Sequence, residues 1–460
     1  MVNWSFRFST PMSKRFRNFT MSIYIDRRLA LIDIICNIAY CACLFKAGII
    51  DFVTKQALVV YLLRLFILIK QKRVCWSTVY EDIHLNIEYL LSKLNPYLSD
   101  FLRTARSRND LVSTDLRIWL KFKLQELFLS LKRLIYSFLS LAVININYIV
   151  PSFTHFQLAQ PVLLSHYFLC YCAMLQRDLI RLRHSYYFAD NMPLGCGAVS
   201  GTSFFIDRIA LMKSLGFNDV YCNSIDAVSD RDYLLDFCYS ISVMMLHISR
   251  FCEEIIIWSN KLFNFVVLSD LHSSGSSMMP QKKNPDGFEL LRAKCSLVIS
   301  NLMAAFVLLK SLPLSYNKDY QEDKRIVFNV ADIACSALAI LGDMLVNLQF
   351  NSTNMYLASD VDFAVATDLA EYLTRNGMSY KQAHALVSAL VRKFYSWGSL
   401  KLIPIEQLLA FSTNRYLINF ISTYTLESVI NAKRSLGGTA RFNVIREIKY
   451  AFVSLSRSNL

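Results

Sequence analysis

Glycine and proline are scarce in this sequence. The chain has 460 residues but only 12 glycines and 9 prolines. Because the turns of an all-β protein depend on these residues, their scarcity disfavours that class and favours long helices. Charged residues are also few, at 18%, while hydrophobic residues reach 54%, which excludes a disordered chain. A chain of this length can build one large core or two to three domains.

Zinc motifs are missing as well. The 12 cysteines are scattered, several of them inside apolar runs, and no CxxC pair repeats. No set of cysteines and histidines has the spacing of a zinc site. We therefore expect reduced thiols in a cytosolic protein, and no metal.

Basic residues outnumber acidic ones and give a net charge of +14. An excess of this size is typical of nucleic-acid-binding proteins. Here, however, the cations are dispersed rather than gathered in a stripe, and no nucleic-acid motif occurs. We expect no nucleic-acid partner, and the sequence does not explain the whole excess of positive charge.

Two segments bear on targeting and membrane insertion. Residues 1–25 contain no acid and several cations, which would suit a transit peptide. We rank that interpretation lower because an enzyme motif, described below, begins inside this region. The richest apolar run, residues 57–69, is interrupted by Arg64 and is shorter than the roughly 20 residues that span a bilayer. A buried helix is therefore expected, and no membrane partner.

Long stretches of the chain repeat apolar residues with helical periodicity. The second of these stretches is apolar nearly all round, which predicts a helix that is internal or at a subunit interface. The predicted long helices cover residues 33–48, 53–70, 111–147, 162–190 and 233–264.

Residues 275–285 have the composition of a functional site rather than of a core. They combine a pair of serines, two lysines, an asparagine, a glycine and two prolines. Glycine and proline limit regular helix here, so a loop is predicted. Ser276 could lose a proton only if positive charge or hydrogen-bond donors stabilised the anion, and Lys282 and Asn284 are of the right type. From spacing alone, a basic surface turn remains an equal alternative.

Two further polar clusters are candidates for binding and proton transfer. Residues 106–110 hold two arginines beside an asparagine, ahead of an apparent helix start at 114–117. Two guanidinium groups so close can grip a carboxylate, although an Arg–Asp network that closes a domain junction is the alternative. His155, in residues 154–161, is predicted at a loop-to-helix entry, and an imidazole can act as acid or base. The glycines of residues 193–208 predict a tight turn that lacks the pattern of a phosphate loop.

Residues 275–285 resemble the G-S-S-x-M-P-x-K-x-N signature of the fumarase/aspartase superfamily, in the form found in its argininosuccinate lyase branch. Other motifs of that branch follow in the same order along essentially the whole chain. They are residues 4–8, 22–26, 80–84, 106–110, 154–161, 193–208, 223–232, 312–324, 366–370, 382–384 and 437–440.

The resemblance implies the reversible β-elimination of argininosuccinate to arginine and fumarate, a step of arginine biosynthesis that needs no metal or organic cofactor. It implies that Ser276 is the base and His155 the acid, oriented by Glu289. Lys282 and Asn284 would steady the dianionic intermediate. The positions carried over as substrate-binding are Ser22, Asp26, His84, Arg108, Asn109, Thr154, Tyr316, Gln321 and Lys324.

Simpler interpretations of these residues stay open from the sequence alone. Ser22 could cap a helix, and His84 could be a structural histidine that hydrogen-bonds within the wall of the site. Residues 312–324 could be the solvated, charged start of a helix. His166 is left as a residue of the core or behind the site.

The resemblance also implies the architecture. We expect a mainly α protein with three helical domains at residues 1–105, 106–360 and 361–460. The long helices of the central domain would bundle with three copies of themselves, and each active site of the homotetramer would draw on three subunits. A cytoplasmic location is expected, with argininosuccinate as the small-molecule substrate.

The chain departs from the family pattern next to residues 106–110. Arg103 replaces a histidine, Ala105 a glycine and Leu111 a glutamine. Two alternatives therefore remain: a sister lyase, acting on adenylosuccinate or in the manner of fumarase, or a catalytically weakened structural homologue on the same fold.

Overall fold

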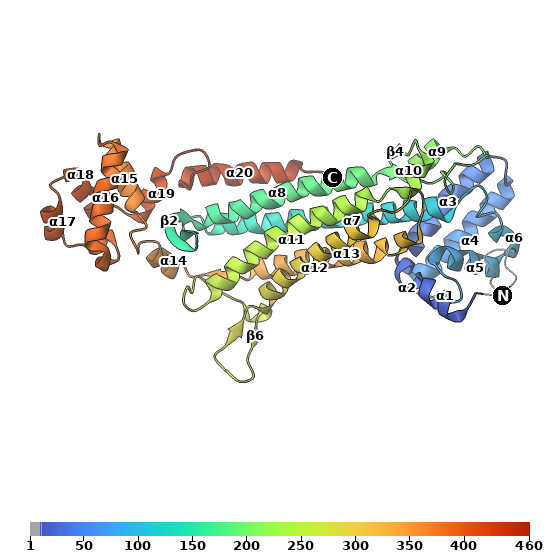
Figure 1. The fold of residues 1–460 in the computed structure, drawn as a ribbon, viewed down its shortest axis with the longest axis horizontal. Coiled ribbons are helices and arrows are strands. Elements are labelled where there is room, and N and C mark those ends of the chain that lie inside the picture. The colour runs from blue at the N-terminus through green and yellow to red at the C-terminus, as the bar shows by residue number, and fades with distance from the viewer. Residues whose placement is uncertain (1–9, 11) are drawn as a thin grey trace.

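The protein is mainly α, as predicted, and its shape is elongated (Figure 1). The computed structural model describes residue 10 and residues 12–460, so the motif at 4–8 lies outside the described residues. Long helices run along the middle of the molecule, with one group of short elements at each end (Figure 1). The described strands form four separate two-stranded sheets, each of which joins loops rather than building a layer.

The N-terminal end is formed by short and medium helices that surround the beginning of the longest helix (Figure 1). These are α1 (Lys14–Thr20), α2 (Ile23–Asp26), α3 (Ala30–Lys46), α4 (Phe52–Lys70), α5 (Ile83–Leu94) and α6 (Pro96–Ser99), with α9 (Arg208–Ser214) and α10 (Ser224–Ser229) nearby.

The middle of the molecule is a bundle of long helices that pack on one another. They are α7 (Arg108–Ile144), α8 (Leu164–Ala189), α11 (Asp232–Ser259), α12 (Asp286–Leu309) and α13 (Asp323–Val346). Aromatic rings fill the core between three of them, where Phe138 of α7 packs on Phe168 of α8 and Phe251 of α11. Such large side chains contribute much of the apolar burial that holds the helices together.

The opposite end carries the C-terminal helices α14 (Ser352–Ala358), α15 (Ala366–Arg375), α16 (Tyr380–Phe394), α17 (Ile405–Phe411), α18 (Arg415–Thr423) and α19 (Leu426–Ala432). The last helix, α20 (Arg441–Arg457), runs back along the bundle and contacts α7 and α8 (Figure 1). The division into three domains stays a prediction.

The predicted helix over residues 111–147 is present, but its start was placed wrongly at 114–117. Helix α7 begins at Arg108 because Ser107 and Asp110 form a capping box, in which each side chain accepts a hydrogen bond from the other residue's backbone. The same Asp110 carboxylate accepts the backbone N–H groups of Gly195 and Gly197, both of which have positive φ. The predicted tight turn at 193–208 is thereby fixed to the start of α7.

Helix α4 is not internal in this chain, which corrects one of the two interpretations of its apolar sequence. Only Leu58, Leu62 and Leu65 are buried. By length and composition alone, α4 and four other described helices could cross a membrane. The remaining interpretation, burial against another subunit, stays a prediction.

His155 does not lie at a loop-to-helix entry, as the sequence suggested. Strands β1 (Ile149–Thr154) and β2 (Gln157–Leu163) form a hairpin, and helix α8 starts only at Leu164. His155 and Phe156 form its two-residue turn with φ of 53° and 59°. Two left-handed residues are typical of a type I′ turn, which usually carries asparagine or glycine, so this sequence gave no local sign of it.

Candidate active site

A polar pocket of about 200 Å³ lies at the N-terminal end of the bundle. It gathers eight of the nine predicted substrate-binding residues, from segments more than 300 positions apart. Its lining is Ser22, Asp26, Asp82, His84, Arg108, Asn109, Val112, Tyr316, Lys318, Gln321 and Lys324. Asp82 and Lys318 were not singled out from the sequence, although both lie inside motifs that were.

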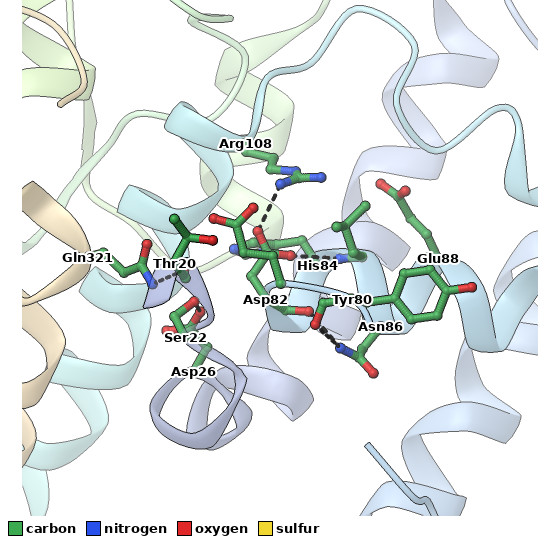
Figure 2. A network of polar contacts seen from close by, with 12 residues as sticks. Thr20, Ser22, Asp26, Tyr80, Asp82, His84, Asn86, Glu88, Arg108 and Gln321 are labelled. Atoms are coloured by element: carbon green, nitrogen blue, oxygen red, sulfur yellow. Dashed lines mark hydrogen bonds and ion pairs between the residues drawn. The ribbon is translucent and has the colours of Figure 1, made fainter. Parts of the chain in front are cut away.

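The loop that holds Ser22 and Asp26 is tied to two other segments. The backbone N–H of Ser22 donates to the carbonyl of Glu81, and the Gln321 side chain donates to the carbonyl of Thr20 (Figure 2). The Ser22 hydroxyl makes no capping bond at the start of α2 but donates to the Asp26 carboxylate. The alternative interpretation of Ser22 as a helix cap is therefore wrong.

The two arginines of residues 106–110 do not grip one anion together. Arg108 donates to Asp82 Oδ2 at 2.9 Å in the pocket, as Figure 2 shows. Arg106 turns away and donates to Asn37 Oδ1 at 2.8 Å. The other oxygen of Asp82 caps α5 by accepting the N–H of Leu85. Arg108 is thus oriented by a carboxylate that is itself fixed to a helix start.

Lys324 is a buried cation at the floor of the pocket. Its ammonium group donates to the Tyr320 carbonyl at 3.0 Å and to Asp323 at 3.1 Å. Burial lowers the pKa of Lys324, but the carboxylates of Asp323 and Asp26 outweigh this and leave the pKa above its usual value. Lys324 therefore stays charged at neutral pH and can bind an anionic group.

His84 faces the pocket with one ring nitrogen engaged behind it. Its Nδ1 lies 2.5 Å from Asp33 Oδ2 and 3.9 Å from Asp115 Oδ2. Within the described chain, these three residues are the group whose ligand atoms come close enough to hold a metal ion, within 4.8 Å. Ligand atoms on one zinc ion lie about 3 Å or more apart, given bond lengths of about 2.0 to 2.2 Å. The short His84–Asp33 contact is therefore that of a hydrogen-bonded pair.

The signature stretch forms a second group. Strands β6 (Ser274–Gly275) and β7 (Lys283–Asn284) pair as a hairpin that projects from the bundle, and the predicted loop is its connection (Figure 1). The Ser276 Oγ accepts the backbone N–H groups of Met278 at 3.3 Å and Met279 at 3.1 Å. These donors are of the kind that stabilise a serine alkoxide.

Other residues anchor this hairpin and open a hollow beside it. Lys283 donates to Asp270 and to the carbonyl of Leu268, which holds the base of the hairpin. A hollow of about 570 Å³ is lined by Lys282, Asn284 and Glu289 among others. Three of the five predicted catalytic residues thus face one space, next to Ser276.

The third group is His155 with Thr154, at the β1–β2 turn. Both side chains are exposed. Among the residues that the structure describes, the His155 side chain makes no hydrogen bond or ion pair. The predicted contact with Glu289, which lines the hollow beside the signature hairpin, is therefore not formed within one chain.

Rigid helices separate the N-terminal pocket from the other two groups. The 37 residues of α7 lie between Arg108 and the β1–β2 hairpin, a length of about 55 Å at a rise of about 1.5 Å per residue. The 24 residues of α12 lie between the signature hairpin and Tyr316, about 36 Å by the same rise. Figure 1 shows α2 and α5 at one end of the molecule, with β2 and β6 far along the bundle. One chain alone cannot bring the predicted residues together.

The three departures from the family pattern are accommodated locally. Arg103 forms a two-point contact with Glu88, with Nε lying 2.7 Å from both carboxylate oxygens. Ala105 takes a left-handed conformation with φ of 60°, where glycine is the usual residue. Leu111 is 3% exposed and belongs to the core.

Known proteins resemble this chain over nearly its full length. A family model described as Lyase matches residues 6–300, and one described as Argininosuccinate lyase C-terminal matches residues 363–436. The argininosuccinate lyase of Geotalea daltonii is 42% identical over 448 residues, which covers 97% of each chain. That of Carboxydothermus hydrogenoformans is 40% identical over 459 residues and covers 99% of this chain and 100% of its own.

Solved structures show the same fold at lower identity. An EDDS lyase in complex with formate has a TM-score of 0.82 at 20% identity, covering 94% of this chain and 87% of that chain. The class II fumarase of Schistosoma mansoni has a TM-score of 0.70 at 17% identity, covering 86% and 91%. The long colinear match to curated relatives, together with the helical fold, confirms the resemblance seen in the motifs. The chain belongs to the argininosuccinate lyase family of carbon–nitrogen lyases, within the fumarase/aspartase superfamily.

Proposed function

We propose that the active site of this lyase is assembled from three subunits of a homotetramer and eliminates fumarate from argininosuccinate. The N-terminal pocket of one subunit would hold the substrate, the signature hairpin of a second would supply the base, and the β1–β2 turn of a third the acid. The observation that carries the proposal is the separation of the N-terminal pocket from the other two groups by the full lengths of α7 and α12 in one chain.

The pocket suits a substrate that carries both charges. Argininosuccinate has three carboxylates as well as ammonium and guanidinium groups. The cations Arg108, Lys318 and Lys324 can bind carboxylates, while Asp26 and Asp82 can bind the positive groups. Because both cationic and anionic side chains line the pocket, it selects the orientation of the substrate as well as its charge.

The chemical difficulty is the removal of a proton from the carbon next to a carboxylate, because the carbanion adds charge to that carboxylate. Ser276 would take the proton, with its oxygen stabilised by the backbone N–H groups of Met278 and Met279. Lys282 and Asn284 would stabilise the dianionic intermediate. His155 would protonate the departing nitrogen, and Glu289 of another subunit would orient it.

Exposed apolar side chains on the bundle favour the tetramer. Leu290, Leu297 and Met303 on α12 are 59%, 52% and 58% exposed in the single chain. Such a surface on a soluble enzyme is typical of a subunit interface. The proposal includes the three domains at 1–105, 106–360 and 361–460, with the central one forming the tetrameric core, and a cytoplasmic location.

The first test is release of fumarate from argininosuccinate by the purified protein, followed by ultraviolet absorbance. Adenylosuccinate and malate serve as control substrates. Signal with argininosuccinate alone is expected. Turnover of a control substrate instead would indicate the specificity of a sister lyase. If a folded tetramer released no fumarate from any of the three substrates, the protein would be a structural homologue.

Complementation between inactive variants tests the sharing of sites. Ser276→Ala and Lys324→Met are each expected to be inactive, but co-refolded mixed tetramers should regain up to about a quarter of the wild-type activity, because some sites then receive both native residues. The matched control pairs Ser276→Ala with Lys282→Met, which lie on the same hairpin. Since every mixed site then lacks one of them, this control should stay inactive, and equal recovery in both mixtures would refute the assembly.

A further inference from the structure

Asp33 is a buried carboxylate behind the substrate pocket, and it lies where three helices meet. It belongs to α3 and is 1% exposed, facing His84 of α5 and Asp115 of α7. Both of its oxygens are engaged, since Asn37 donates to Oδ1 at 2.6 Å and the ring of His84 lies against Oδ2 at 2.5 Å. The position of this carboxylate is therefore fixed from two sides.

The pairing leaves one nitrogen of His84 for the pocket. With Nδ1 against Asp33, only Nε2 can reach a ligand, and His84 lines the cavity. Within the described part of the chain, Nε2 has no hydrogen-bond partner. An imidazole held at one nitrogen by a carboxylate presents the other nitrogen with its orientation and tautomer fixed.

Asp115 of α7 completes the surroundings of the ring. It is fully buried, beside Cys36 and Asp33. Burial, together with the neighbouring charge of Asp33, raises the pKa of Asp115 well above its usual range. Of the two carboxylates, Asp33 is the one in hydrogen-bond contact with the ring, while Asp115 Oδ2 lies 3.9 Å from Nδ1.

We propose that Asp33 is a positioning residue of this enzyme, which holds His84 as an imidazolium whose Nε2–H donates to a carboxylate of the bound substrate. The inference rests on the proposed function, because it assigns a task within the same pocket. Asp33 does not touch the substrate and acts only through the histidine ring.

The charges around His84 agree with this assignment. The groups that face it are Asp26 of α2, Asp33 of α3, Asp82 before α5, Asp115 of α7 and, beyond Asp26, Lys324 of α13. Burial lowers the pKa of His84, but Asp33, Asp82 and Asp115 outweigh it and raise the pKa to about 9. The ring therefore keeps both protons through the neutral range, which makes it a charged donor rather than a base.

The test compares Asp33→Asn with a matched control inside the same protein. Asp178 holds a second buried histidine, since His247 Nδ1 lies 2.7 Å from Asp178 Oδ2, and this pair lies in the bundle outside the pocket lining. Asp178→Asn therefore perturbs a buried Asp–His pair without touching the site. Both variants are assayed for kcat/KM with argininosuccinate against pH.

Asp33→Asn is expected to lower kcat/KM about 10- to 100-fold at pH 8, with part of the loss recovered at lower pH, where the ring regains its proton. The loss should appear mainly in KM, since the interaction is with bound substrate. Asp178→Asn should leave the pH dependence of kcat/KM unchanged. Equal changes in the two variants would overturn the proposal, because they would show a general effect on stability.

A second measurement needs no activity. Carbon-13 NMR of labelled histidine rings in the ligand-free wild-type protein, with His84 assigned by loss of its signal in His84→Gln, should show titration near pH 9. Titration at or below the ordinary value of 6.5 would overturn the proposal, as would stoichiometric zinc bound to the purified protein. If argininosuccinate were not turned over but His84 titrated near 9, the proposed function would fail while the pairing stood.

Discussion

Replacing Ala105 by glycine should stabilise this enzyme, which is the opposite of the usual effect of glycine. Ala105 lies in the turn before α7 with φ of 60°, a left-handed conformation. Its carbonyl accepts a hydrogen bond from the Tyr40 hydroxyl at 3.0 Å, and Tyr40 is buried. The turn therefore cannot relax to suit the residue that it contains.

The expected change in the free energy of unfolding is the difference between two effects of opposite sign. A residue with a Cβ atom costs roughly 1 to 2 kcal/mol in the left-handed helical conformation. Glycine gains freedom in the unfolded chain, which costs about 0.4 to 1 kcal/mol of stability. The net expectation for Ala105→Gly is a gain of about 1 kcal/mol in the free energy of unfolding. For a chain of 460 residues this corresponds to a rise of about 1 °C in Tm.

The assay is calorimetric unfolding at one fixed protein concentration, because an oligomer's Tm depends on concentration. The matched control is Ala47→Gly, at the end of α3, where φ is −76°. No strain is relieved there, so the control should lose about 0.4 to 1 kcal/mol. We therefore expect the free energy of unfolding to rise for Ala105→Gly and to fall for Ala47→Gly. A loss at both positions would refute the reasoning that this loop stores backbone strain.

Ala105→Gly also restores one of the family residues that this chain has lost, and Arg103→His restores another. Arg103→His combined with Ala105→Gly should preserve or raise activity toward argininosuccinate, because the pocket residues themselves are unchanged. A collapse of activity would show that the Arg103–Glu88 contact has become part of the loop's working geometry.

Three further outcomes are expected. Ser276→Ala should abolish turnover while sedimentation shows an intact tetramer; dissociation, or retention of most activity, would contradict the role of the serine. Arg117→Met should destabilise the fold by about 3 to 5 kcal/mol in denaturant unfolding, because Asp230 loses its buried partner, and an unchanged midpoint would count against that account. The folded pKa of His84, about 9, lies above its ordinary value of 6.5, so its contribution of about 3 kcal/mol should be complete below pH 6.5 and disappear through pH 9. Unfolding free energies of wild type and His84→Gln, measured from pH 6 to 10, should converge at the alkaline end, and a constant difference would refute this linkage.

Helices were predictable from the sequence because their signal is local. The apolar period and the flanking polar residues placed α3, α7, α8 and α11 within a few residues. The start of α7 was misplaced because Ser107 and Asp110 looked like parts of a binding cluster, although they cap the helix. The β1–β2 hairpin was missed since its turn contains His155 and Phe156, which are rare at positive φ.

The candidate site was predictable as a set of residues but not as an arrangement. Motif resemblance supplied Ser22, Asp26, Arg108 and Lys324, and the fold brings these four into one cavity. Nothing in the local sequence of Asp33 indicated a role, since it reads as one polar residue at the start of an apolar helix. Only the meeting of α3, α5 and α7 places it against His84.

The sequence by itself determined the helical class, the family and most of the candidate site residues, because periodicity and motifs are properties of neighbouring positions. Tertiary structure decided which of these residues meet. Helices α7 and α12 are rigid spacers, so they keep the signature hairpin and His155 away from the N-terminal pocket in one chain. Tertiary contacts also shift protonation. Burial and the charge of Asp33 raise the pKa of Asp115 well above its usual range, while neighbouring carboxylates outweigh burial and raise the pKa of His84 to about 9. No local sequence pattern records either effect.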